Sequence, residues 1–362
     1  MKVLVVYASA GAGHFKAAEA IYAHLKRSRP DCRLENIDIL RYVNPAFRAS
    51  YNTYSFLVKY APSIWRLGFL ITAFRALRPF TRPLARLISR LSTRKFSAFL
   101  LKENPDCIIS THFLPSEIAA CLKACGEIRS RVITVITDFG VHPFWINAGT
   151  DLYIVASDLT RQKLIAEGIP GNLIRALGIP INDKFLGVFH KDELSGKFNL
   201  RERQCTVLLA TGSFGIGPIE KIVEALSGAV QMLVVCASNK KLFAQLQRKN
   251  YPGVRIFGFV DNIQELMAVS QIIITKPGGL SIAESLVMEL FPIFIAPIPG
   301  QETENVSVLS SYGLGICTDD ISAIKGAVLA LCAQPKKLES ALKIIRRLKK
   351  PNATKDICDA VC

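Results

Sequence analysis

A short β-branched run at residues 272–275, Ile-Ile-Ile-Thr, constrains the fold most, because a Pro-Gly-Gly turn stops it and a helical pattern follows. Strand, glycine-rich turn and helix are the order of a βα unit in a parallel sheet. This order points free backbone N–H groups and the positive end of a helix dipole at one place, which suits a phosphate. Glu284 lies one helical turn beyond Leu280 and Ser281, where a carboxylate suits a ribose diol. On spacing alone, an ordinary βα turn with a helix glutamate remains the alternative.

A second polar loop follows the next expected strand, at residues 291–296. It reads Pro-Ile-Pro-Gly-Gln-Glu-Thr-Glu-Asn and supplies Gln301, Glu302 and Asn305. In a parallel sheet both loops lie at the carboxyl ends of strands, where ligands bind. These three side chains are hydrogen-bonding groups suited to sugar hydroxyls.

Together, Lys-Pro-Gly-Gly at residues 276–279 with Glu284, and Pro-Gly-Gln-Glu at 299–302 with Asn305, resemble the donor site of glycosyltransferase family 28. The likeness is greatest to the monogalactosyldiacylglycerol synthases of plastids and the diacylglycerol glucosyltransferases of bacteria. The peptidoglycan GlcNAc transferase is a more distant relative. The resemblance runs over most of the chain and implies an α/β GT-B fold, with two doubly wound Rossmann-like domains facing across a cleft.

The resemblance also implies a UDP-sugar as co-substrate, with no cofactor and no metal. A strand at residues 206–210 leads into a second glycine-rich loop, which in the family faces the diphosphate and sugar. The loop after the strand at 254–260 holds the uracil in relatives. The UDP-sugar-binding candidates are therefore Gly13, Gly212, Ser213, Phe214, Gly215, Phe259, Val260, Lys276, Pro277, Gly278, Gly279, Leu280, Ser281, Glu284, Gln301, Glu302 and Asn305.

The first strand, at residues 3–7, is followed by a turn of small residues and then by His14 at a helix start. The loop lacks the Gly-Lys-Ser/Thr of a Walker sequence and the third glycine of a dinucleotide fingerprint. An imidazole has the near-neutral pKa that a general base needs, although a histidine that caps or packs a turn is the alternative. In the family the matching histidine lies between donor and acceptor, as a base or as a ligand to the donor.

Strands at residues 107–110 and 132–136 end in polar loops that each carry a histidine. Asp138 is a second candidate for the base, or an orienter of His14. His112, Pro115 and His142 are expected to shape the mouth of the acceptor site. The relatives carry His-Pro in the first loop, where this chain has His-Phe-Leu-Pro.

The net charge of +16 is concentrated in one stretch, because no acidic residue occurs between Asp38 and Glu103 while twelve lysines and arginines do. Aromatic and leucine side chains alternate with the cations, which is typical of amphipathic helices in a bilayer interface. Pro62, Pro79 and Pro83 are expected to break the stretch into pieces. Nucleic-acid binding and a solvated basic face are the alternatives. The acceptor or membrane candidates here are Trp65, Arg66, Arg82, Arg86 and Arg90.

With 362 residues, about two domains are expected. We predict an acceptor- and membrane-binding domain at 1–181, a linker at 182–203, a UDP-sugar-binding domain at 204–335 and a helix at 336–362 that returns to the first domain. The first strand begins almost at Met1 and no run of about 18 apolar residues occurs, so a peripheral protein on the cytoplasmic face of the membrane is expected. The ten cysteines show no zinc-site spacing and are expected to be free thiols.

These observations predict transfer of glucose or galactose from a UDP-sugar to diacylglycerol, with inversion and without a metal. The expected partners are the donor, a lipid acceptor and an anionic membrane surface, and no nucleic acid. The alternatives are a UDP-GlcNAc transferase acting on a lipid-linked cell-wall precursor, a UDP-sugar epimerase, and a basic nucleic-acid-binding protein.

Overall fold

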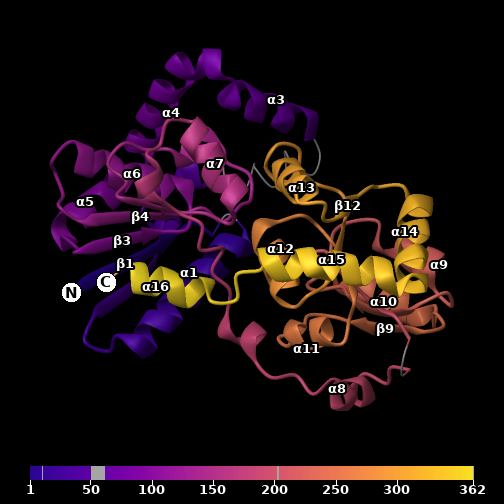
Figure 1. The fold of residues 1–362 in the computed structure, drawn as a ribbon. Helices are drawn as coiled ribbons and strands as arrows, with labels where there is room; N and C mark the ends of the chain where they lie inside the picture. Colours follow the sequence, from indigo (N-terminus) through magenta and orange to yellow (C-terminus); the bar gives the residue numbers. More distant parts are fainter. Residues whose placement is uncertain (10, 50–61, 202–203, 362) are drawn as a thin grey trace. The chain divides into compact units, whose positions relative to one another are not determined.

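The computed structural model describes residues 1–9, 11–49, 62–201 and 204–361, without the side chains of residues 62, 65, 73, 75 and 78. The chain forms two compact units (Figure 1). The first comprises Met1–Asn182, Ile298–Asn305 and Asn352–Cys362, and the second comprises Asp183–Pro297 and Val306–Pro351. The first unit therefore includes the polar segment that carries Gln301, Glu302 and Asn305.

The first unit is built on a six-stranded parallel sheet in the order β2-β1-β3-β4-β5-β6. Its strands are β1 (Lys2–Tyr7), β2 (Arg33–Asp38), β3 (Cys107–Ser110), β4 (Arg131–Val135), β5 (Leu152–Ile154) and β6 (Ile174–Arg175). The central strands are unbroken apolar runs because helices cover both faces of a parallel sheet. The order reverses beside β1, so the carboxyl ends of β1 and β3 form the edge where ligands bind in such sheets.

Helices cover both faces of this sheet. The cluster on one face includes side chains of α1 (Ala12–Ser28) and α16 (Ala353–Val361), which lie side by side (Figure 1). The cluster on the other face includes side chains of α5 (Arg94–Glu103) and α6 (Phe113–Ala124). Further elements of this unit are α7 (Asp158–Ala166), η1 (Ile39–Arg41), η3 (Pro143–Trp145) and η4 (Gly171–Leu173).

Between residues 62 and 92, the basic stretch folds into α3 (Pro62–Ala73), η2 (Arg75–Leu77) and α4 (Arg78–Ser92), whereas its residues 50–61 lie outside the described part. The predicted break holds for Pro79, which lies in the first turn of α4 directly after η2. Pro62 is the first described residue of α3, and the residues before it lie outside the described part. The predicted break is wrong for Pro83, which lies inside α4. Pro83 is exposed and only removes the hydrogen bond to the first-turn carbonyl of Pro79, so the helix continues. In the part of the chain that the structure describes, every helix is too short or too polar to cross a membrane.

The second unit contains a six-stranded parallel sheet in the order β12-β11-β10-β7-β8-β9. Its strands are β7 (Thr206–Ala210), β8 (Gln231–Val235), β9 (Val254–Phe257), β10 (Ile272–Thr275), β11 (Phe291–Phe294) and β12 (Ile316–Cys317). Its helices are α8 (Lys191–Lys197), α9 (Ile219–Leu226), α10 (Lys240–Arg248), α11 (Ile263–Ala268), α12 (Gly279–Val287), α14 (Ile321–Ala333) and α15 (Pro335–Leu348), with the turn η5 (Asp183–Leu186). Helix α13 (Gln301–Ser311) begins in the first unit and ends in the second.

The segment predicted as a linker contains η5 and the short helix α8, whose first turn carries Asp192 and Glu193 as a helix dipole favours. One further expectation is wrong: the cysteines are not all free thiols, since a disulfide joins Cys205 and Cys332. These cysteines are 127 residues apart, so no local spacing indicates the pairing.

Candidate functional site

The carboxyl ends of three neighbouring strands bring one imidazole together with two threonines. His14 lies in the first turn of α1, directly after the loop that follows β1, whereas Thr111 follows β3 and Thr137 follows β4. The Nδ1 atom of His14 lies 2.8 Å from the carbonyl oxygen of Thr111 and 2.8 Å from Oγ1 of Thr137. The Thr111 hydroxyl donates in turn to the carbonyl oxygen of His14, at 2.9 Å. These contacts hold the ring at the ligand-binding edge of the sheet.

The partners of His14 decide where its proton lies. A carbonyl oxygen can only accept a hydrogen bond, so Nδ1 of His14 must carry the hydrogen that Thr111 accepts. In the neutral ring Nε2 then keeps its lone pair, which is the form that a general base requires. Burial lowers the pKa of His14, while the charge of Asp138 and the hydrogen bond to Thr111 act in the opposite direction. The half-buried ring therefore stays neutral to a lower pH than a free histidine.

Asp138 is buried, and amide groups rather than a histidine hydrogen-bond to it. Its Oδ1 accepts from Nδ2 of Asn305 at 3.0 Å and its Oδ2 accepts from Nε2 of Gln301 at 2.8 Å. Burial raises the pKa of Asp138, whereas the charge of His14 and these hydrogen bonds lower it. The carboxyl group thus influences His14 through its charge.

Asn305 is fully buried and orders the loop after β4. Its Oδ1 accepts from the backbone N–H groups of Phe139 at 2.7 Å and Gly140 at 2.9 Å. In the same segment, Oε2 of the buried Glu302 accepts from the backbone N–H of Ile298 at 2.7 Å. The three polar residues of this segment therefore all have protein partners within the first unit.

The other two histidines of this region cap helices. Nδ1 of His112 accepts from the backbone N–H of Leu114 at the start of α6, and Nδ1 of His142 accepts from Phe144 at the start of η3. Both neutral rings therefore carry their hydrogen on Nε2, the opposite of His14. Burial and the charge of His14 hold the pKa of His112 well below its usual range. The rings of His14 and His112 are 4.7 Å apart at 80°, and Pro115 is buried in the first turn of α6.

In the second unit, the turn after β10 forms as the sequence predicts. Helix α12 begins at Gly279, and its N-cap residue Gly278 has no side chain with which to satisfy the first N–H groups. The first turn of α12 contains no acidic residue, so it can attract an anion. Lys276 is half-buried before this turn, and Glu284 is half-buried on the helix. Pro277, Leu280 and Ser281 complete the same segment.

The glycine-rich loop after β7 is anchored to the loop after β8. The Ser238 hydroxyl donates to the carbonyl oxygen of Ser213 at 2.8 Å, and Nδ2 of Asn239 donates to that of Gly215 at 3.1 Å. Gly215 has a φ of 56° and a side chain there would meet the carbonyl oxygen of Cys236, so only glycine fits. The buried Oγ1 of Thr211 has no hydrogen-bond partner among the described residues.

Two aromatic candidates of this unit project from its loops. Phe214 is 67% exposed and Phe259, directly before the half-buried Val260, is 70% exposed. Both lie beyond the carboxyl ends of strands, β7 and β9 respectively. Aromatic side chains in such positions are suited to a planar base or a sugar face.

The helices α3 and α4 carry an exposed apolar and basic surface. Eleven large apolar side chains between residues 64 and 91 are exposed, namely Ile64, Leu67, Leu70, Ile71, Phe74, Leu77, Phe80, Leu84, Leu87, Ile88 and Leu91. Arg66, Arg86 and Arg90 are exposed among them, and the side chain of Trp65 lies outside the described part. An apolar surface this large is typical of a membrane or protein contact.

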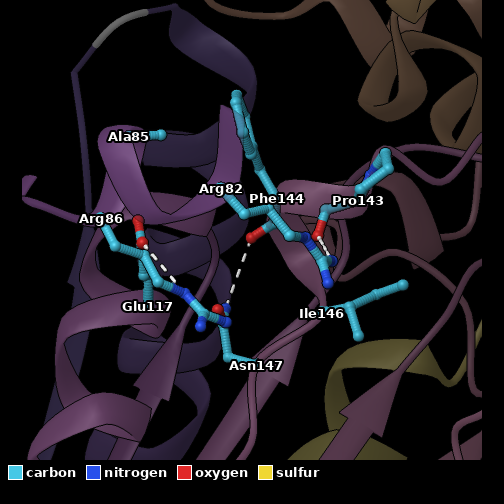
Figure 2. Close-up of a pocket in the computed structure, with 8 residues that line it drawn as sticks. All are labelled: Arg82, Ala85, Arg86, Glu117, Pro143, Phe144, Ile146 and Asn147. Atoms are coloured by element: carbon cyan, nitrogen blue, oxygen red, sulfur yellow. Dashed lines mark hydrogen bonds and ion pairs between the residues drawn. The ribbon is translucent and has the colours of Figure 1, made fainter. Parts of the chain in front are cut away.

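A small pocket lies under α4, against α6 and η3 (Figure 2). Nη2 of Arg82 donates to the carbonyl oxygen of Pro143 at 2.7 Å, and Nε of Arg86 is 3.9 Å from Oε1 of Glu117. Burial raises the pKa of Glu117, and Arg86 acts against it. Two of the arginines predicted for membrane contact therefore also fasten α4 to the first unit.

Sequence reasoning missed four residues that support these sites: Thr111, Thr137, Ser238 and Asn239. Each follows a strand, so its place beyond the carboxyl end of that strand was the available signal. Trp145, whose ring lies 6.4 Å from that of His14, gave no comparable signal. Among the described residues, no group of three His, Cys, Asp or Glu side chains could hold a metal ion.

Two family models match the chain. Residues 14–181 match the model described as monogalactosyldiacylglycerol (MGDG) synthase. Residues 206–357 match the C-terminal domain of glycosyltransferase family 28. A processive diacylglycerol beta-glucosyltransferase of Bacillus cereus is 27% identical over 371 residues, covering 99% of this chain and 93% of the relative.

Solved structures support the fold. MurG of Acinetobacter baumannii is 12% identical with a TM-score of 0.60, and the match covers 99% of each chain. A UDP-GlcNAc 2-epimerase of Neisseria meningitidis is 13% identical with a TM-score of 0.60, again over 99% of each chain. The predicted α/β fold of two doubly wound parallel sheets, GT-B, is confirmed. Since a transferase and an epimerase share it, the fold alone does not decide the reaction.

Proposed function

Since the chain belongs to glycosyltransferase family 28, we propose that it transfers a hexose from UDP-glucose or UDP-galactose to the free hydroxyl of diacylglycerol. The resemblance predicted from the donor-site motifs is confirmed by both family matches. A relative named for diacylglycerol glucosylation that matches nearly the whole chain supports the lipid acceptor. The same relative favours a transferase over the epimerase alternative.

The proposed base is His14. Its Nδ1 hydrogen is fixed by the carbonyl oxygen of Thr111, which leaves the Nε2 lone pair for the acceptor hydroxyl. Both oxygens of Asp138 already accept hydrogen bonds from amides, so we assign to Asp138 the electrostatic stabilisation of protonated His14. The contact between Nδ1 of His14 and the carbonyl oxygen of Thr111 is the observation that carries the mechanism.

In the reaction, the acceptor oxygen forms a bond to the anomeric carbon while its proton passes to Nε2 of His14. The bond between the anomeric carbon and the diphosphate oxygen breaks, and its electron pair leaves with UDP. Attack from the face opposite the leaving group inverts the configuration. We propose that the first turn of α12 and the glycine-rich loop 211–217 stabilise the diphosphate charge through backbone N–H groups, so that no metal is needed.

We assign the ribose to Glu284, the uracil to the Phe259-Val260 loop and positive charge near the diphosphate to Lys276. Gln301, Glu302 and Asn305 remain our candidates for the region of the donor sugar, together with Gly13, although their amides and carboxylates have protein partners. His112, Pro115 and His142 are proposed to shape the acceptor side.

We also propose that α3 and α4 dock the enzyme peripherally on the cytoplasmic face of an anionic membrane. The exposed apolar side chains of residues 64–91 would enter the interface, and Arg66, Arg86 and Arg90 would meet anionic headgroups. The apolar content of this surface favours a membrane over nucleic acid as the partner.

The direct test is transfer from labelled UDP-glucose, UDP-galactose and UDP-GlcNAc, run in parallel, to diacylglycerol in vesicles containing phosphatidylglycerol. We expect lipid-extractable label from one of the two hexoses and loss of label in the His14→Gln variant. Label from UDP-GlcNAc alone would reject glucose and galactose as the transferred sugar while keeping diacylglycerol as the acceptor. UDP binding without any lipid label would reject diacylglycerol as the acceptor.

A further inference from the structure

We propose that Thr137 is a positioning residue for catalysis, whose hydroxyl holds the imidazole of His14 with its hydrogen on Nδ1. This inference rests on the proposed role of His14 as the base. Oγ1 of Thr137 lies 2.8 Å from Nδ1, as close as the carbonyl oxygen of Thr111. Because both oxygens lie on the Nδ1 side, the opposite nitrogen is the one offered to the substrate.

The hydrogen of the Thr137 hydroxyl has a second partner that fixes its direction. Oγ1 of Thr137 also lies 3.4 Å from the carbonyl oxygen of Thr111, to which the hydroxyl can only donate. A hydroxyl that donates to Thr111 presents its lone pairs to Nδ1–H of His14. The three groups therefore form a closed set in which Nδ1–H is shared by two acceptors.

This set takes the place that a carboxylate has in a Ser-His-Asp triad, where it orients the ring and stabilises the imidazolium. The nearby alternatives are engaged elsewhere: Asp138 accepts from Gln301 and Asn305, and Nδ1 of His112 accepts from the backbone of α6. When the proton of the acceptor hydroxyl reaches Nε2, the ring becomes positive. The hydrogen bonds from Nδ1–H then become charge-assisted and stronger.

A purely structural role for Thr137 makes a different prediction. The side chain is only 4% exposed, and valine has the same shape, so valine would serve equally well if Thr137 only filled space. Thr134 offers a matched control, because it is a fully buried threonine of β4 whose hydroxyl bonds to Ser116 and not to His14. A loss of activity that Thr137→Val and Thr134→Val share therefore reflects lower stability alone.

The experiment measures kcat and kcat/KM against pH for the parent and for Thr137→Val, Thr137→Ser and Thr134→Val, with the donor that the parent uses. We expect Thr137→Val to lower kcat about tenfold, the effect of losing one hydrogen bond to a charged group. The acid limb of kcat/KM should move to lower pH, because an imidazolium with one acceptor fewer loses its proton more easily. Thr137→Ser should restore both quantities, and Thr134→Val should leave the acid limb where it is.

Nitrogen NMR of histidine-labelled protein gives a readout that does not need activity. The signals of His14 are identified by their absence in His14→Gln, and we expect the Nδ1–H form in the parent and a lower pKa in Thr137→Val. An Nε2–H form, or identical titration of the parent and Thr137→Val, overturns the inference. Full activity of His14→Gln rejects the proposed base instead, while the NMR result still decides whether Thr137 holds the ring.

Discussion

Replacing Asn305 with alanine should destabilise the first unit strongly, because one buried amide makes three hydrogen bonds there. Its oxygen accepts from the backbone N–H groups of Phe139 and Gly140, and its nitrogen donates to Asp138. Alanine leaves two backbone donors without this acceptor, at about 1 kcal/mol each, and takes one hydrogen bond from a carboxylate, at about 2 kcal/mol. The free energy of unfolding should fall by about 4 kcal/mol in total.

For a unit of this size, each kcal/mol lowers the midpoint of thermal unfolding by about 2–4 °C, so a decrease of about 8–16 °C is expected. Calorimetry of the parent and of Asn305→Ala measures it. Ser307→Ala is the matched control, since Ser307 is exposed on the same helix α13. If the midpoint of Asn305→Ala stays within about 2 °C of the control, the hydrogen bonds of Asn305 to Asp138, Phe139 and Gly140 together stabilise the unit by far less than about 4 kcal/mol.

Asn305→Asp sharpens this test. It keeps an oxygen for the two backbone donors but places a second carboxylate against Asp138, so the pair must share one proton. One folded-state pKa is then raised above its unfolded value. That contribution to stability is present at low pH and is lost as the pH rises through the raised pKa. If the free energy of unfolding depended on pH in the same way in this variant and in the parent, the result would contradict the contact.

Three further predictions concern acid sensitivity, a glycine and the membrane surface. Burial lowers the folded-state pKa of His14 and His112, so the unfolded chain takes up protons first and the free energy of unfolding should fall as the pH drops below about 6.5. The variant His112→Asn keeps an acceptor for the N-cap of α6, and between pH 6.5 and 5 its free energy of unfolding, measured with urea, should depend less steeply on pH than that of the parent. An equally steep dependence would contradict the assignment. Gly300→Ala should lower the free energy of unfolding by more than the roughly 1 kcal/mol of backbone strain expected for Gly168→Ala. Both glycines have φ near 90°, but a side chain at Gly300 would lie 2.5 Å from the ring of Phe69, whereas Gly168 faces open space. Adding Phe69→Ala to Gly300→Ala should remove the difference between the two sites, and equal losses for the two single variants would argue against the contact with Phe69. The double variant Arg66→Ala/Arg90→Ala should bind phosphatidylglycerol vesicles about thirtyfold more weakly than the parent, at about 1 kcal/mol per cation. The double variant Lys240→Ala/Lys241→Ala on α10 should bind as the parent does. Equal losses of binding in co-sedimentation would mean that net charge alone governs binding.

The parts of the fold that could be predicted from the sequence are those that depend on neighbouring residues. Unbroken apolar runs located central strands such as β1, β3, β4, β7 and β10. The strands β2, β6 and β12, which lie at sheet edges, gave no such signal. Strand β2 is only partly buried and carries Arg33, Glu35 and Asp38, so it lacks an apolar run.

The candidate site likewise has parts that the sequence could locate and parts that it could not. The position of His14 at a helix start and the anion-binding turn before α12 follow from neighbouring residues, so sequence could locate them. Hydrogen-bond partners could not be predicted, because Thr137 is 123 residues from His14 and Asn305 is 167 residues from Asp138. The rules of parallel sheets bring such residues to one edge, but they do not determine which oxygen faces which nitrogen.

The choice of neutral partners for His14 has a chemical consequence for the proposed mechanism. A carboxylate bonded to Nδ1 would raise the pKa of the ring and favour the protonated form before substrate arrives. A carbonyl and a hydroxyl fix the same tautomer without a full charge, and burial holds the pKa below its usual value, so the ring is neutral and able to accept a proton at neutral pH. The charge of Asp138 then acts at a distance and favours the imidazolium as the proton arrives. Replacing Thr137 with aspartate would exchange this arrangement for a triad, and the acid limb of kcat/KM should move to higher pH, opposite to the change expected for Thr137→Val.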